Sequence, residues 1–160
     1  MPQKFIESFV ARLRQIYSFA VKISDHREKL VQGTVYFAPG GRTNLMLADP
    51  EAPKFIRRPR SDANDVCPSI DVLLESAAAL GDRAVGVVLS GMGCDGAKGL
   101  LSMRNAGAST IAQDQATSVV YGMPRAAYEN GGARHVAPLH KIGGALLDIC
   151  TKAEIGVEAV

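Results

Sequence analysis

The residues best suited to chemistry lie in a glycine-rich turn, Ser90-Gly91-Met92-Gly93-Cys94-Asp95-Gly96. An apolar run before it, residues 84–89, predicts a buried strand, and residues 96–106 after it predict a helix. Turns between a strand and a helix hold the functional groups of many α/β proteins. Asp95 either orients a catalytic histidine, as the acid of a hydrolase triad does, or caps a helix. Composition and spacing alone favour the cap.

The thiol of Cys94 is a second candidate in this turn. It is predicted to lie at a helix N-terminus, where the helix dipole activates thiols as nucleophiles. No histidine is close to it in the sequence. A lone cysteine in a turn is more often inert, so we favour an unreactive thiol.

Dinucleotide binding is a third candidate, because Gly91-x-Gly93-x-x-Gly96 formally matches the fingerprint of that site. Asp114 follows Gly96 by 18 residues, near the spacing expected of a ribose-binding acid. The pyrophosphate of the ligand would bind at the helix N-terminus. The Asp95 carboxylate there would repel it and occupy its donors. Dinucleotide binding through these glycines therefore remains a weaker alternative.

The elements that position the turn follow from the apolar pattern and its breakers. Helices and strands alternate from residue 68 onward, which predicts an α/β fold, doubly wound, with a mostly parallel sheet and helices on both faces. The polar residues 57–66 predict a solvated loop. The predicted helices are 3–16, 68–80, 96–106, 124–130 and 139–151, and the predicted strands are 19–23, 33–38, 44–47, 54–56, 84–89, 108–112 and 134–137. We expect one domain over residues 1–150 and a tail over residues 151–160.

Two loops should lie at the functional edge of the predicted sheet. Residues 90–96 and 113–123 each follow a strand, and the two strands are consecutive parallel strands. The carboxyl ends of parallel strands meet at one edge of a sheet. We therefore expect these two loops to be neighbours in space.

The composition is that of an ordinary globular protein, with 47% hydrophobic residues, 21% charged residues and a net charge of +2. Such a weak charge gives no support for nucleic acid as a partner. No apolar run approaches the ~18 residues that span a bilayer, and the amino terminus lacks a signal-peptide core. Three widely spaced cysteines fit neither disulfides nor a metal site. We expect a cytoplasmic protein without metal or cofactor.

Several longer motifs resemble one known family. They are Gly33–Gly40 (GTVYFAPG), Pro68–Leu73 (PSIDVL), Leu89–Gly96 (LSGMGCDG) and Ala112–Pro124 (AQDQATSVVYGMP). Together they resemble the catalytic domain of the chemotaxis-receptor protein-glutamate methylesterases, over Met1 to about Leu147. The resemblance implies a doubly wound α/β fold and a Ser-His-Asp mechanism. It further implies hydrolysis of glutamate methyl esters on the cytoplasmic helices of chemotaxis receptors, and in many members deamidation of receptor glutamines.

The resemblance assigns roles to three residues of the turn. Asp95 matches the triad aspartate, and Met92 and Gly93 match the turn that lines the active site. The family's serine and histidine have no counterpart here, because the chain opens with Met1-Pro2, which in the family follow the histidine. The first strands of the fold, and often a receiver domain, precede that point in the family.

We therefore expect a fragment of such an esterase that is inactive by itself, because triad members act as a unit. A non-catalytic receptor-binding remnant is the alternative. The three histidines and the serine of the second loop carry no role from the resemblance: His26, His135, His140 and Ser118.

Overall fold

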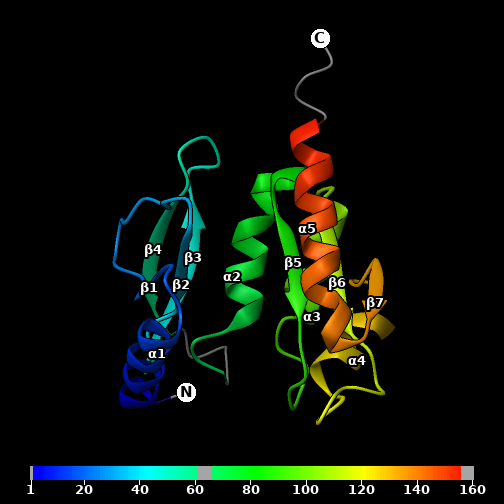
Figure 1. Cartoon of the computed structure of the whole chain (residues 1–160), viewed down its shortest axis with the longest axis horizontal. Coiled ribbons are helices and arrows are strands. Elements are labelled where there is room, and N and C mark those ends of the chain that lie inside the picture. Colours follow the sequence, from blue (N-terminus) through cyan, green and yellow to red (C-terminus); the bar gives the residue numbers. More distant parts are fainter. Residues whose placement is uncertain (1, 61–65, 156–160) are drawn as a thin grey trace.

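The computed structural model describes residues 2–60 and 66–155 (Figure 1). Two groups of strands lie on either side of helix α2 (Ile70–Ala77). The amino-terminal group comprises α1 (Gln3–Ile16), β1 (Ala20–Ile23), β2 (Thr34–Phe37), β3 (Thr43–Ala48) and β4 (Lys54–Pro59). The carboxyl-terminal group comprises the 3₁₀ helix η1 (Ala78–Arg83), β5 (Val85–Val88), α3 (Ala97–Asn105), β6 (Ser109–Gln113), α4 (Met123–Glu129), β7 (His135–Ala137) and α5 (Leu139–Ile155).

The sheet β5-β6-β7 is parallel throughout and confirms the predicted α/β architecture. Figure 1 shows α5 across its front and α3 and α4 behind it. This is the arrangement that parallel strands require, because each crossover helix must cover a face of the sheet.

The core of this group forms where α3 and α4 pack on the strands. Leu100 of α3 and Ile111 and Ala112 of β6 have no exposed surface. Small residues bring the helices close to the sheet: a Cβ on Gly86 would lie 2.6 Å from Leu100 Cδ1. The β5–α3 turn is therefore anchored to a tightly packed base.

The amino-terminal strands form two further sheets within the described residues. β1 pairs with β2 in parallel, and β3 pairs with β4 as an antiparallel hairpin. Ile6 and Val10 of α1 pack on Val21 of β1 to form a small buried cluster. Phe5 and Phe9 of the same helix remain 55% and 41% exposed.

Three elements differ from their predicted bounds by two residues or more. The helix predicted over 68–80 begins at Ile70 after the cap Ser69 and becomes 3₁₀ at Ala78. The loop predicted from residue 57 begins later, because β4 continues to Pro59 through pairing with β3. Residues 61–65 of that loop and 156–160 of the predicted tail lie outside the described residues, and α5 itself continues to Ile155.

The basic residues of β4 are more structured than a solvated loop. The Arg57 guanidinium donates to the Ser24 carbonyl and to Asp25 Oδ1, which ties β4 to the segment after β1. Within residues 2–60 and 66–155, no helix is long and apolar enough to cross a membrane.

Candidate active site

The glycine turn after β5 follows a path that only glycine adopts without strain. Gly93 and Gly96 have φ values of 86° and 94°, in the left-handed region. Gly96 is also buried, and a Cβ there would lie 2.8 Å from Ile70 Cγ2 of α2. The turn therefore approaches the start of α2 as closely as it does because residue 96 lacks a side chain.

The Asp95 carboxylate accepts three hydrogen bonds from the start of α2. The Ser69 hydroxyl and the Asp71 amide donate to Oδ1 at 2.9 and 3.0 Å, and the Ile70 amide donates to Oδ2 at 2.8 Å. The first amides of a helix have no partners within it, and they favour a negative charge. Asp95 is therefore a cap, but of α2 rather than of α3, the helix that follows it in the chain.

This finding corrects the argument against a dinucleotide site. Asp95 was expected to occupy the donors of α3, whereas it occupies those of α2. Asp114, the candidate ribose ligand, accepts instead from the amide and hydroxyl of Thr117, at 2.9 and 2.6 Å. These contacts give Asp114 a structural task in its own loop.

A reciprocal contact joins the same two helices. Asp71, in the first turn of α2, accepts from the amide of Gly99, in the first turn of α3, at 2.8 Å. The N-terminus of α2 thus receives a carboxylate from the turn before α3, and the N-terminus of α3 receives one from α2. A Cβ on Gly99 would lie 2.6 Å from Leu74 Cβ, so the helices approach closely here. Together, the Asp95 and Asp71 contacts fix Asp95 relative to both helices.

The loop over residues 113–123 lies directly beside the glycine turn, as predicted. The buried Gln113 accepts from the Ser90 amide at 2.8 Å and donates to the Thr117 carbonyl at 2.7 Å. The amide of Gly91 donates to the Val120 carbonyl at 3.0 Å. Gln113 therefore joins the ends of β5 and β6, a role that its position in the sequence did not reveal.

The tips of these loops are open to solvent. Met92 is 85% exposed and Val119 is 93% exposed, and Gly93 and Cys94 are exposed beside them. Met92 and Gly93 therefore lie on the surface of the turn that carries Asp95. Their role as active-site lining stays a prediction.

The histidines and the candidate serine of this chain do not contact Asp95. His26 Nδ1 accepts from the Arg57 amide at 3.0 Å, and His135 and His140 are exposed. The Ser118 hydroxyl donates to the Asp114 carbonyl at 2.7 Å. No histidine donates to Asp95 in the part of the chain that the structure describes, nor do its acidic, cysteine and histidine residues form a cluster able to hold a metal.

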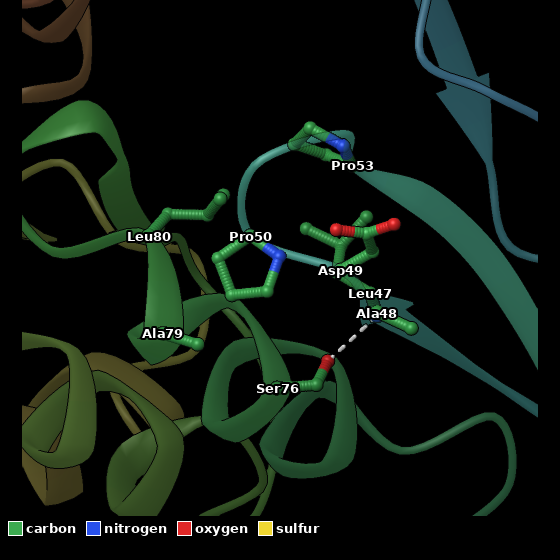
Figure 2. Close-up of a pocket in the computed structure, with 8 residues that line it drawn as sticks. All are labelled: Leu47, Ala48, Asp49, Pro50, Pro53, Ser76, Ala79 and Leu80. Atoms are coloured by element: carbon green, nitrogen blue, oxygen red, sulfur yellow. Dashed lines mark hydrogen bonds between the residues drawn. The ribbon is translucent and has the colours of Figure 1, made fainter.

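The hollow between the β3–β4 hairpin and α2 lies away from Asp95. Figure 2 shows it beside Leu47, Ser76 and Leu80, with the Leu47 amide donating to the Ser76 hydroxyl at 2.9 Å. It measures about 140 Å³ and is largely apolar. Ser76 belongs to the last turn of α2, whereas Asp95 binds the first. The hollow is therefore separate from the candidate site.

Fold and turn together define an α/β domain that presents a firmly held carboxylate at the carboxyl edge of a parallel sheet. The family model described as CheB methylesterase matches residues 1–146. The crystal structure of the Thermotoga maritima CheB methylesterase catalytic domain is similar, with a TM-score of 0.86 at 35% identity. The alignment covers 93% of this chain and 79% of that one. The chain belongs to the CheB methylesterase family.

Two relatives named protein-glutamate methylesterase/protein-glutamine glutaminase are similar over nearly the whole chain. The protein of Gluconobacter oxydans is 45% identical over 97% of it, and that of Agrobacterium fabrum is 45% identical over 99%. The chain spans 45% of the length of each relative, less than half. The resemblance found in the motifs is thus confirmed.

Proposed function

We propose that this chain is the aspartate-bearing part of a protein-glutamate methylesterase that uses a Ser-His-Asp triad. One observation carries the proposal. An ionised carboxylate has about four acceptor sites on its two oxygens. Ser69 and Asp71 fill the two of Oδ1, and Ile70 fills one of Oδ2. Asp95 Oδ2 thus keeps one acceptor site, which suits a single further donor such as a histidine ring N–H.

In this proposal Asp95 orients the histidine and stabilises its protonated form. The serine attacks the ester carbonyl of a methylated glutamate, and the histidine takes its proton and passes it to the leaving methoxide, so that methanol departs. Water then hydrolyses the acyl-enzyme, freeing the glutamate. Deamidation of a glutamine follows the same steps, with ammonia as the leaving group. The serine and the histidine come from the segment that precedes Met1 in the family.

The exposed apolar surface of the amino-terminal elements supports the presence of that segment. Phe5, Ile16 and Val35 are between 41% and 59% exposed on α1 and β2. The sheets β1-β2 and β5-β6-β7 share no ladder within the described residues. Further strands, which the resemblance places before Met1, would cover such surface and pair with such edges.

The partners follow from the same proposal. The substrates are methylated cytoplasmic helices of chemotaxis receptors, and the protein acts in the cytoplasm. A receiver domain is a further partner when one precedes the catalytic part.

Methanol release from methylated receptor tests the proposal. The purified chain should release none. A chimera that joins the preceding segment of the Agrobacterium fabrum relative to Met1 should be active. Asp95→Asn in that chimera should lower kcat by about 10⁴-fold, as loss of a triad aspartate does.

Asp82→Asn, an exposed position outside the turn, is the matched control and should leave kcat unchanged. Methanol release by the chain alone at the rate of the chimera would refute the proposal, and so would full activity of the Asp95→Asn chimera. The lack of a histidine donor to Asp95 among the described residues favours the receptor-binding remnant as second candidate. That candidate predicts a chain that binds methylated receptor and a chimera that releases no methanol.

A further inference from the structure

We propose that Ser69 is a positioning residue for Asp95, and that its hydroxyl determines which carboxylate oxygen stays free for the histidine. The inference rests on the proposed function, since it concerns the acid of that triad. It assigns a task in the reaction to a residue 26 positions before Asp95 in the sequence.

The Ser69 hydroxyl uses both its donor and its acceptor capacity. It donates to Asp95 Oδ1 at 2.9 Å and accepts from the Val72 amide at 3.3 Å. A hydroxyl has one proton to donate, and the Val72 contact leaves it directed at Asp95. Ser69 is 7% exposed, so water competes little for either contact.

The backbone of Ser69 is held from the opposite side. Its amide donates to Asn44 Oδ1 at 2.9 Å, and Asn44 lies on β3 with only 4% of its surface exposed. The hairpin, Ser69 and Asp95 thus form a continuous chain of hydrogen bonds. Asn44 places Ser69, and Ser69 places the carboxylate.

The distribution of donors over the two oxygens gives the hydroxyl its specific effect. Oδ1 accepts from both Ser69 and Asp71, which fills its two acceptor sites, whereas among residues 2–60 and 66–155 Oδ2 accepts from Ile70 alone. Loss of the hydroxyl would leave one free site on each oxygen. The carboxylate would then offer the histidine two competing geometries, and the proton relay would be less well oriented.

Substitutions at Ser69 separate this role from its role as the N-cap of α2. Alanine removes both the cap and the hydroxyl donor, and the loss of the cap lowers stability. Glycine is a nearly adequate cap but has no hydroxyl. Threonine keeps both, and its preference for extended backbone suits φ −92° and ψ 133° at this position.

The test measures kcat and KM for methanol release in the chimera described above. We expect Ser69→Ala and Ser69→Gly to lower kcat equally, by roughly tenfold, as loss of one hydrogen bond to a charged group does. KM should stay constant, and Ser69→Thr should restore most of the rate. A purely structural role predicts instead that kcat follows stability, with the alanine variant impaired and the glycine variant not.

Ser76→Ala is the matched control, because Ser76 also joins α2 to β3 but does not contact Asp95. It should lower the melting temperature without changing kcat.

A second readout needs no activity. In the chain as it stands, the carbon-13 resonance of the Asp95 carboxyl should shift alike in Ser69→Ala and Ser69→Gly and return in Ser69→Thr. An inactive wild-type chimera would overturn the proposed function, and with it this inference. An active wild-type chimera with unchanged kcat in both the alanine and glycine variants, or an unmoved Asp95 resonance, would overturn this inference alone.

Discussion

The amino-terminal and carboxyl-terminal elements differ in how far they bury their apolar residues. Around β6, Leu100, Ala108 and Ile111 have no exposed surface, and helices cover both faces of the sheet. On β1, the described residues form a smaller buried cluster of Ile6, Val10 and Val21. Phe9 instead packs edge-on against Phe37, with ring centroids 5.6 Å apart, and remains 41% exposed.

The difference shows that strands with similar apolar patterns are buried to different extents because different numbers of helices pack on them. A parallel pair such as β1-β2 needs cover on both faces. Within the described residues, α1 is the helix that packs on it. We therefore expect the stability of the chain to reside mainly in the carboxyl-terminal group.

Truncation of one apolar residue in each group, buried in one and exposed in the other, tests the contrast with the largest expected effect. Leu100→Ala, at a fully buried position, should lower the free energy of unfolding by about 2–5 kcal/mol. Val35→Ala, at a position 41% exposed, should cost less than about 1 kcal/mol. Urea denaturation followed by circular dichroism measures both. Equal losses would contradict the contrast.

A glycine substitution tests the contact between the two loops of the site. A Cβ on Gly122 would lie 2.8 Å from the Gly91 carbonyl oxygen, so Gly122→Ala should cost about 1–3 kcal/mol by forcing the loops apart. Gly143→Ala on α5, where a Cβ would meet nothing within 4 Å, should instead stabilise the protein by about 0.5–1 kcal/mol. Thermal denaturation gives both values, and a Gly122→Ala protein as stable as wild type would disprove the close approach.

The contact between Asp71 of α2 and the N-terminus of α3 predicts a smaller effect on stability. Asp71→Ala leaves the Gly99 amide without its acceptor and should cost about 1 kcal/mol. Glu75→Ala, at an exposed position on α2, removes a charge without removing such a contact and should have little effect. Amide hydrogen exchange at Gly99 should accelerate in the first variant only. Unchanged exchange there would argue against the cap.

The smallest expected effect is a pH dependence of stability that arises from Glu28 in the amino-terminal group. The hydrogen bond from Lys22, followed by that from the Asp25 amide, lowers the pKa of Glu28 in the folded protein. Because the folded pKa lies below the unfolded one, the resulting stability is present above the unfolded pKa of about 4.3. It is lost as pH falls through the folded pKa. Urea midpoints from pH 6 to pH 3 should show this loss in wild type, and Glu28→Gln should reduce it.

Local pattern predicted most of the elements because each depends on residues close in the sequence. The alternation after residue 68 predicted β5, β6 and β7 and their helices, and turn residues marked the loops between them. The predicted bounds were wrong where contact with a residue distant in the sequence extends or ends a helix or strand. Pairing with β3 carries β4 to Pro59, and the contact with Asp95 places the start of α2 at Ile70.

For the candidate site, the sequence determined that Asp95 lies in a rigid turn beside a second loop, because glycine spacing and strand order are local properties. The partner of that carboxylate was decided only by tertiary structure. Asp95 caps α2 rather than α3 because packing through Gly96 and Gly99 brings the free amides of α2 within reach. Hydrogen bonds between residues some 25 positions apart depend on how helices pack, and no local pattern encodes that distance.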